Sequence, residues 1–454
     1  MMEKAPDLDG YNIRVIQDFK NENVYTSLIV PQLNKIEKDY LYWDKIKYVK
    51  KPNSLEMEYP EDYPSEVWRL VKTQRMLNLR SYSLRRWDDD GRFPSRVGID
   101  YKFYPNSSLQ QKLHYLDFNF GAGIQKEKLL SDLDKDQYLN NALMEESIFS
   151  SMVEGATTTR VKAKEMLRKN KKPKSKSEQM ILNNYQAIQF ISEHQEEDMS
   201  IDKLFEIHRL VTVDTLEDSN IGVFRTSDDV HVMNDITGEI IHTPPKFEEL
   251  NELMQSFCEF FNSNPKENFI HPIVKASILH FLIGYVHPFV DGNGRTARAI
   301  FYWYLLKNGY WLAEYLSISR VIIKSKVQYE KAYIYTEIDD MDVTYFVHYQ
   351  VKVLTQAFED LKEYVAKQKI EQHSFSKFLK IDGVNERQAQ ILFWIEKDGN
   401  RSFTVKEIET IFSVTNQTAR ADLEELVRQE FIKKVPIDKK SSNYWKGDLF
   451  ESLI

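Results

Sequence analysis

The chain has 454 residues, of which 42% are hydrophobic and 29% are charged, and this length predicts two to four domains of about 100–200 residues each. A single cysteine, Cys258, excludes an internal disulfide framework and any cysteine-rich zinc or iron–sulfur site. Lys and Arg total 61 against 69 Asp and Glu, a net charge of −8, which argues against general polyanion binding but allows a local basic patch.

The first twenty residues contain no apolar run of the kind that a signal peptide needs. No uncharged apolar stretch reaches about 18 residues, the length of a membrane span. The longest candidate, residues 273–290, contains Lys275, Gly284 and two histidines and therefore predicts a buried core helix. We expect a cytoplasmic protein with no membrane partner.

Residues 1–125 mix short helical patterns with turn-rich segments such as Asp88-Asp89-Asp90-Gly91. The mixture predicts a helical and irregular N-terminal subdomain. It contains no catalytic signature, and we interpret it as a subdomain for packing or specificity.

Residues 126–366 form the second predicted region, in which apolar residues recur at helical spacing. The predicted helices cover residues 134–151, 178–194, 201–211, 247–261, 273–286 and 295–308. They predict a mainly α domain, built as a helical bundle. Between Lys162 and Lys176 lie eight basic residues and one acidic residue. We interpret this segment as a solvated, mobile surface loop, with a patch for nucleic acid or an acidic partner as the alternative.

A β-hairpin interrupts the helical pattern. Two β-branched runs, Val230-His231-Val232-Met233 and Ile240-Ile241-His242-Thr243, are joined by a loop that contains a glycine. Pro244-Pro245 stops the second strand.

Residues 384–454 form the third predicted region, with three helices and two short strands. These elements are expected at residues 388–397, 404–412, 416–429, 432–436 and 444–445. Three helices followed by a hairpin predict a winged-helix domain, with Thr415 or Asn416 as the cap of its recognition helix.

The recognition helix would bring Asn416, Gln417, Thr418 and Arg420 to the edges of DNA bases. Against DNA binding, this region holds 11 Lys and Arg and 12 Asp and Glu, whereas DNA-binding domains are usually basic. Protein contact or homodimer formation through the winged helix is the alternative.

The segment from His287 to Arg298 concentrates the residue types of phosphate chemistry. His287 can take a proton from a hydroxyl near neutral pH. Asp291 can hold Mg²⁺, which takes few carboxylates and shares phosphate oxygens. Gly292-Asn293-Gly294 allows backbone N–H groups at a helix start to approach an anion. Arg295 and Arg298 share a helix face and suit a polyphosphate. Together these residues predict phosphate-bond chemistry with a nucleotide.

These twelve residues match the Fic family signature, His-x-Phe-x-(Asp/Glu)-Gly-Asn-Gly-Arg-x-x-Arg, at every fixed position. Around it, His271-Pro272, Asn183-Asn184-Tyr185 and Gly222-Val223-Phe224-Arg225 resemble family segments, and the hairpin resembles the family's flap. The resemblance covers residues 135–366 and implies a Fic-type bundle.

Fic proteins typically transfer AMP from ATP to a Ser, Thr or Tyr hydroxyl of a target protein. The resemblance implies that His287 is the general base, that Phe289 anchors the loop and that Asp291 binds Mg²⁺. It implies that Gly292, Asn293 and Gly294 form the anion hole and that Arg295 and Arg298 contact phosphates. Relatives that act as kinases carry Lys at the place of Arg295, so Arg295 favours nucleotidyl transfer. The flap residues Val230, His231, Val232 and Met233 would bind the target by main-chain pairing.

Ser150-Ser151-Met152-Val153-Glu154-Gly155 resembles the family's inhibitory motif, (Ser/Thr)-x-x-x-Glu-(Gly/Asn), near the end of a helix expected at 138–155. The resemblance implies that Glu154 pairs with Arg298 and so blocks the γ-phosphate of ATP. We therefore expect an autoinhibited protein adenylyltransferase, which also modifies itself. A de-adenylylase, or a winged-helix DNA-binding regulator with the Fic site as nucleotide sensor, is the alternative. Tyr329 and Tyr333 are candidates for the nucleotide base pocket, with core packing as the alternative.

Overall fold

The computed structural model describes residues 4–6, 30–50, 62–87, 94–120, 132–233, 238–263, 269–412, 414–437, 441–448 and 450–453. Most of the first twenty residues and the Asp88-Asp89-Asp90-Gly91 segment lie outside them. The chain forms two compact units, Met1–Leu361 and Lys362–Ile454. The boundaries expected near residues 125, 366 and 384 remain predictions.

In the described residues, the N-terminal part of the first unit contains four helices and one hairpin. Its elements are α3 (Val30–Asp39), α4 (Trp43–Ile46), α5 (Tyr63–Met76), β1 (Arg80–Trp87), β2 (Pro94–Phe103) and α6 (Ser107–Phe120). The strands β1 and β2 pair antiparallel, with Arg80 opposite Phe103, and the sequence reading did not predict this hairpin. Lys102 of β2 exchanges backbone hydrogen bonds with Met341 and Val343, which attaches the hairpin to the bundle.

A buried polar cluster joins this part to the helix that starts at residue 344. The Arg75 guanidinium is fully buried and donates to Glu37 at 2.7 Å and to the Tyr345 hydroxyl at 2.7 Å. The Tyr40 hydroxyl donates to Asp342 at 2.6 Å. Because each buried charge has partners, the cluster fixes how the N-terminal part packs on the bundle.

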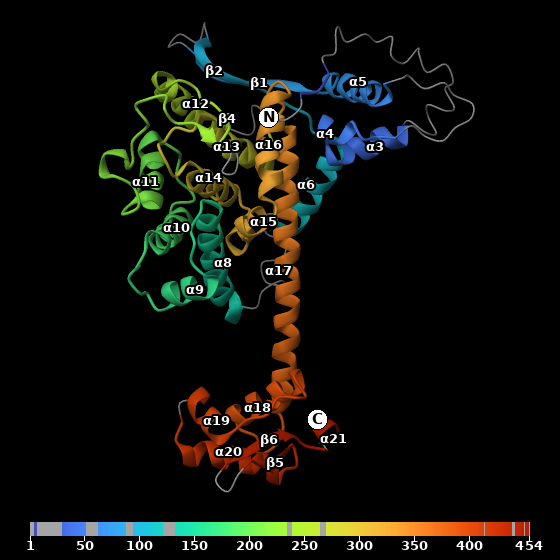
Figure 1. Ribbon diagram of the computed structural model, residues 1–454, viewed down its shortest axis with the longest axis vertical. Coiled ribbons are helices and arrows are strands. Elements are labelled where there is room, and N and C mark those ends of the chain that lie inside the picture. Colours follow the sequence, from blue (N-terminus) through green and yellow to red (C-terminus); the bar gives the residue numbers. More distant parts are fainter. Residues whose placement is uncertain are drawn as a thin grey trace, which may run out of the picture. The chain divides into compact units, whose positions relative to one another are not determined.

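Apart from a short hairpin, the other described elements of the first unit are helices (Figure 1). They are α8 (Asp132–Val153), α9 (Arg160–Arg168), α10 (Lys176–Glu193), α11 (Ile201–Thr212), α12 (Leu250–Asn262), α13 (Pro272–Val286), α14 (Asn293–Lys307), α15 (Ile318–Lys324), α16 (Lys326–Ile338) and α17 (Thr344–Leu379), with short 3₁₀ turns at Asp218–Asn220, Phe247–Glu249 and Trp311–Tyr315. The predicted mainly α bundle is confirmed. The helix α17 continues past residue 361 into the second unit.

The helices α13 and α14 form the centre of the bundle. Nearly every residue of α13 is buried, because the helix is apolar on all sides. It begins at Pro272, where a missing N–H costs nothing, and the His271 ring accepts from the Ile273 N–H at 3.2 Å. Six residues separate the two helices, and they hold the loop that the motif predicts to be catalytic.

The flap is a short hairpin of β3 (Val232–Met233) and β4 (Ile240–His242). Val232 pairs with His242, and Met233 pairs with Ile240. The predicted hairpin is therefore present, with Val230 and His231 just before its first strand. Residues 234–237 lie outside the described residues.

The loop predicted at residues 162–176 is wrong over its first half. Residues 160–168 form α9, because Thr159 caps the helix and the apolar Ala163 and Met166 are buried between α8 and α10. Arg160 donates to Glu145 of α8 at 2.8 Å. The many charged residues of this segment obscured the helical spacing of the two apolar residues, Ala163 and Met166.

The second unit is a winged helix, as predicted. Its elements are α18 (Glu386–Lys397), α19 (Val405–Phe412), α20 (Asn416–Arg428), β5 (Ile432–Pro436), β6 (Ser442–Lys446) and α21 (Phe450–Leu453). Leu392, Ile408, Leu423 and Tyr444 are buried together in its core. Thr415 caps α20 by accepting from the Thr418 N–H. Among the described residues, no helix is long and apolar enough to cross a lipid bilayer.

Candidate active site

His287 ends α13 in a left-handed backbone conformation, with φ 47° and ψ 57°. Its Nδ1 lies 3.2 Å from the Gly284 carbonyl oxygen. Since a carbonyl oxygen only accepts, Nδ1 carries the proton of the neutral ring and Nε2 holds the free electron pair. His287 also lines a cavity of about 450 Å³. The geometry therefore suits a base that acts through Nε2.

The loop after His287 closes on itself through Asn293. The Asn293 side chain accepts from the Phe289 N–H at 2.9 Å and donates to the Phe289 carbonyl at 2.8 Å. Gly292 caps α14 with φ +87°, and a Cβ there would lie 2.7 Å from Thr212 Cγ2. Only glycine fits this position, which sets the start of α14 beside His287.

His208 on α11 packs against the loop after His287 and hydrogen-bonds to it. No sequence pattern indicated this role. Its ring stacks on Phe289 with centroids 3.7 Å apart. The Gly222 N–H donates to Nδ1 at 3.0 Å, so Nε2 carries the proton and donates to the Asp291 carbonyl at 2.9 Å. Burial lowers the pKa of His208 to about 4, which keeps the ring neutral and this pattern intact near pH 7.

Arg298 lies at the junction of α14 and α8. It is buried and donates to the Ser150 hydroxyl at 2.8 Å, to the Ser150 carbonyl at 3.0 Å and to Glu154 Oε1 at 3.0 Å. Burial disfavours its charge, but Glu154 and other neighbours outweigh this and raise its pKa. Its Nη1 is buried with no partner among the described residues. A donor of this kind suits an incoming anion.

Arg295 points away from the cavity. Its guanidinium is buried, donates to the Val211 carbonyl at 2.6 Å and lies 3.3 Å from Asp291 Oδ1. In this structure it therefore ties α14 to the end of α11 and to the loop. The phosphate contact expected of Arg295 remains a prediction.

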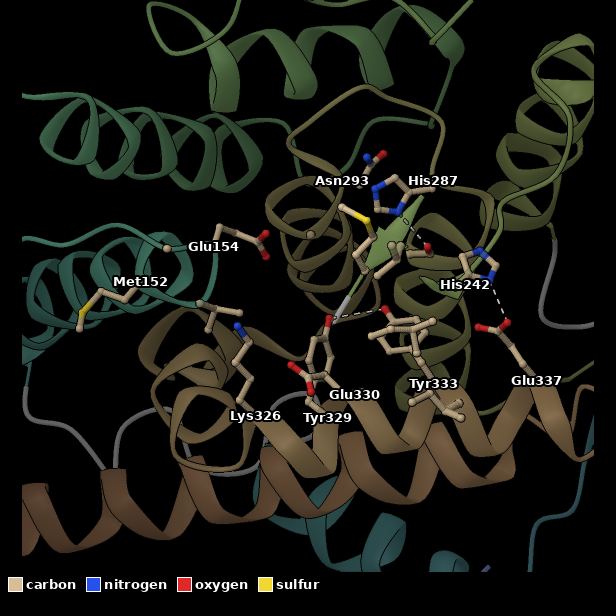
Figure 2. A pocket seen from close by; sticks show the side chains of 18 residues that line it. Met152, Glu154, His242, His287, Asn293, Lys326, Tyr329, Glu330, Tyr333 and Glu337 are labelled. Carbon is tan, nitrogen blue, oxygen red and sulfur yellow. Dashed lines mark hydrogen bonds and ion pairs between the residues drawn. The ribbon is translucent and has the colours of Figure 1, made fainter. Parts of the chain in front are cut away.

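Glu154 lies in the segment that resembles the inhibitory motif, where α8 ends and Gly155 turns the chain with φ +89°. Its carboxylate lies against Gly294, where a Cβ would overlap Oε1. Glu154 thus occupies the space in front of the first turn of α14 while it pairs with Arg298. Figure 2 shows its carboxylate beside the cavity. The structure places Ser150, Glu154 and Arg298 together.

The cavity lies between the end of α8, the flap, the turn at His287 and one side of α16 (Figure 2). Its lining includes Glu154, Val232, Met233, His242, His287, Asn293, Gly294, Lys326, Tyr329, Glu330, Tyr333 and Glu337. Both tyrosines suggested for the base pocket thus line it. His280 fixes Tyr329, because its Nε2 lies 2.9 Å from the hydroxyl.

Asp291 was predicted to bind Mg²⁺. Its side chain is 47% exposed, and Oδ1 accepts from the Gly292 N–H at 2.5 Å. Within the described ranges no hydrogen bond reaches Oδ2, and no group of three His, Cys, Asp or Glu could form a metal cage. One free carboxylate oxygen fits Mg²⁺ that takes its other ligands from phosphates and water.

Two segments of the chain match known domain families. Residues 198–305 match the Fic/DOC family, and residues 387–435 match the DeoR-like helix-turn-helix domain.

The curated relatives are proteins named protein adenylyltransferase Fic. The one from Nematostella vectensis is 35% identical over 114 residues, which are 25% of this chain and 24% of that protein. The one from Drosophila melanogaster is 36% identical over 115 residues, 25% of this chain and 21% of that protein. The chain thus spans about a quarter of the length of these relatives.

Among solved structures, a Fic family protein from Desulfovibrio desulfuricans G20 is 18% identical, with a TM-score of 0.47, over 75% of this chain and 94% of that chain. The Fic/DOC match contains the whole segment from His287 to Arg298. The chain therefore carries a Fic/DOC family domain, followed by a DeoR-like helix-turn-helix domain.

Proposed function

We propose that the protein is an autoinhibited adenylyltransferase that transfers AMP from ATP to a Ser, Thr or Tyr hydroxyl of a target protein. One observation carries the proposal: His287 Nε2, the N-terminus of α14 and Glu154 meet at one cavity, with Arg298 behind them. The name of the curated relatives supports the same activity.

In the proposed reaction the target hydroxyl attacks the α-phosphorus of ATP. A bond forms between the hydroxyl oxygen and phosphorus, the bond to the pyrophosphate oxygen breaks, and the hydroxyl proton goes to His287 Nε2. The tautomer fixed by Gly284 leaves this nitrogen free to accept. Positioning and charge stabilisation supply most of the acceleration in phosphoryl and nucleotidyl transfer.

The phosphates would lie at the N-terminus of α14, where backbone N–H groups and the helix dipole favour anions. Gly294 has no side chain to fill this place, and the groups near it are the Glu154 carboxylate and Arg298 Nη1. Mg²⁺ on Asp291 would neutralise phosphate charge when bound. The Nη1 group of Arg298, which has no partner among the described residues, is the donor for the terminal phosphate.

The flap would hold the target by strand pairing. Its sheet has two strands, so β3 presents a free edge within the described part of the chain. The side chain of Met233 on this strand is 57% exposed. Main-chain pairing along this edge would place a target hydroxyl near His287 without a strong demand on its neighbouring side chains.

Autoinhibition by Glu154 makes the first prediction. Replacing Glu154 by glycine removes the carboxylate beside Gly294 and releases Arg298, so incorporation of labelled AMP from ATP should rise at least about tenfold, the equivalent of one hydrogen bond to a charged group. The measurement uses the protein itself and a cell lysate as acceptors. An unchanged rate would contradict the inhibitory role.

Glu154→Gly combined with His287→Ala is the matched control, because it opens the site but removes the base. It should label no acceptor, yet keep the unfolding midpoint of the Glu154→Gly protein. Full activity in the double variant would contradict the assignment of His287.

Removal of AMP is a second candidate function, favoured by the free oxygen of Glu154. Oε1 pairs with Arg298, whereas no hydrogen bond to Oε2 is found among the described residues. Glu154 and His287 both line the cavity, so Oε2 could orient a water there. A protein acceptor labelled by the Glu154→Gly variant, then mixed with wild type, tests this. Release of AMP that needs Glu154 would establish removal as an activity.

A further inference from the structure

Arg225 lies between the catalytic loop and the base of the flap. It is 3% exposed, although it belongs to an irregular segment after α11. Its backbone N–H donates to the Pro288 carbonyl at 2.9 Å, and its Nε donates to the His287 carbonyl at 3.1 Å. Arg225 thus binds two successive carbonyl groups at the point where α13 ends and the loop begins.

The other end of the same guanidinium closes the base of the flap. Nη1 donates to the Ser227 carbonyl at 2.8 Å and to Asp228 Oδ1 at 3.0 Å, and Nη2 donates to the Pro245 carbonyl. Asp228 also accepts from the Phe247 N–H at 2.7 Å. The chain enters the flap after Ser227 and leaves it before Pro245. The Arg225 guanidinium therefore holds the two ends of the flap together.

The charge and shape of Arg225 both matter for this arrangement. Four acceptors at fixed angles use the planar fork of the guanidinium, which lysine cannot reproduce. His287 is held at φ 47°, a conformation that costs about 1–2 kcal/mol for a residue with a Cβ and therefore needs support from its surroundings. The Arg225 bond to the His287 carbonyl is such a support.

We propose that Arg225 is a positioning residue, which fixes the backbone of His287 relative to the flap and thereby aligns the base with the target hydroxyl. The proposal rests on the proposed transfer of AMP. Arg225 does not line the cavity, so it acts through His287 and the flap rather than on the nucleotide.

Four groups act on the pKa of His287: the Gly284 carbonyl on α13, His242 on β4, Glu154 at the end of α8, and Arg225. Burial lowers the pKa of His287, and the charges of His242 and Arg225 lower it as well, whereas the Gly284 hydrogen bond and Glu154 raise it. Loss of the Arg225 charge should therefore raise the pKa of His287, and the base should then lose its proton only at higher pH.

The test compares Arg225→Gln and Arg225→Lys, both in the Glu154→Gly protein. Both should lower kcat for AMP transfer to the protein itself by roughly 100-fold, the effect of a misplacement of about 1 Å, with KM for ATP unchanged. Only Arg225→Gln should move the acid limb of the pH–rate profile to higher pH, because Arg225→Lys keeps the charge. Arg428→Gln, which removes an arginine of the second unit whose side chain is 76% exposed, should change neither quantity.

A second readout does not depend on activity. Histidine-ring NMR titration of the full chain, with the His287 signal assigned from its absence in His287→Gln, gives the pKa of His287 directly. It should rise in Arg225→Gln and stay in Arg225→Lys. An unchanged His287 titration with unchanged kcat overturns the positioning role. If none of the proteins transfers AMP, the proposed function fails, while the titration still decides whether Arg225 governs His287.

Discussion

At the scale of single residues, Gly292 holds a left-handed backbone conformation at a place in the loop after His287 where a side chain has no room. Its φ is +87°, and a Cβ would lie 2.7 Å from Thr212. Gly238 near the flap also has positive φ, at +66°, but no described atom lies within 4 Å of the place where a Cβ would stand. A side chain at either position would be strained by the positive φ, but only at Gly292 would it also overlap a neighbouring atom. Comparing substitutions at the two glycines therefore distinguishes the two effects.

Gly292→Ala should lower the free energy of unfolding more than Gly238→Ala does. Alanine at a left-handed position costs about 1–2 kcal/mol, which both variants share, while the overlap with Thr212 adds a further cost only at Gly292. Thermal unfolding of the full chain measures the difference. Equal losses would show that Thr212 moves aside freely.

The buried His208 predicts a loss of stability in mild acid. Its pKa is about 4 in the folded protein and 6.5 ordinarily, so between these values the unfolded chain binds a proton that the folded chain does not. Stability from this group is complete above pH 6.5 and falls as pH decreases, by about 1.4 kcal/mol at pH 5.5.

His208→Gln should remove that portion of the pH dependence. Glutamine can keep a donor near the Asp291 carbonyl but does not titrate. Urea unfolding of both proteins at pH 7.5 and 5.5 gives the comparison, and the fall in wild type should exceed the fall in the variant. Other buried histidines, such as His348, whose pKa burial lowers to about 3, contribute equally to both proteins. The same fall in both would exclude His208 as the source.

At the scale of elements, α8 is held along its length rather than only at Glu154. Glu146 is buried and accepts from the Ser319 N–H at 3.0 Å and from the Ser317 hydroxyl at 2.9 Å. The Asn184 amide of α10 donates to Ser151 at 2.8 Å. Burial raises the pKa of Glu146. Release of Glu154 from Arg298 is therefore expected in the last turn of α8, not by detachment of the helix.

Glu146→Ala tests this attachment. It leaves the Ser319 N–H and two hydroxyl groups without their acceptor, at about 1–3 kcal/mol of stability, and the looser helix should raise basal AMP transfer above wild type but below Glu154→Gly. Labelling rates and unfolding midpoints are measured together. A rate equal to that of wild type, with the expected loss of stability, would show that Glu154 acts independently of the helix anchor.

Prediction from sequence succeeded where a local pattern sets the structure. The turn after His287 and the helices on either side of it follow from residue type and spacing. The flap follows from them as well. Arg225 was not recognised as a support, because all but one of its acceptors are backbone carbonyls, and the His287 carbonyl lies 62 residues away. His208 was missed for the same reason: its partners are the backbone groups of Gly222 and Asp291. The hairpin of β1 and β2 has polar and charged residues on both faces, so its sequence lacks the alternation of apolar and polar residues that predicts a strand.

At the scale of the whole molecule, the two units pose separate questions, and the net charge of −8 answers neither. In the second unit, Asn416, Gln417 and Arg420 of α20 are exposed. Lys434 of the wing, however, pairs with Glu424 at 2.5 Å, and Lys433 pairs with Asp448 at 2.7 Å. These pairs reduce the charge that Lys433 and Lys434 can offer to phosphates. Lys439 and Lys440 of the same wing lie outside the described residues.

Arg420→Ala should weaken DNA binding by about 1–3 kcal/mol if α20 reads bases. The matched control is Arg428→Ala at the other end of α20, where Arg428 is 76% exposed in its side chain and pairs with Glu425. Gel shifts with genomic fragments at low and physiological salt measure the affinity. No binding by wild type at either salt would leave protein contact or dimer formation as the role of the winged helix.

Cys258, the sole cysteine, lies buried on α12, where burial raises the pKa of its thiol to about 12. At pH 8 almost none of it is thiolate, the form that reacts with maleimides. We therefore expect Cys258 to react very little with thiol-specific labels, so a label would attach almost entirely to an introduced cysteine. A cysteine placed at the exposed Met233 would carry a fluorophore or spin label at one known position, so that flap movement can be followed while nucleotide or target binds.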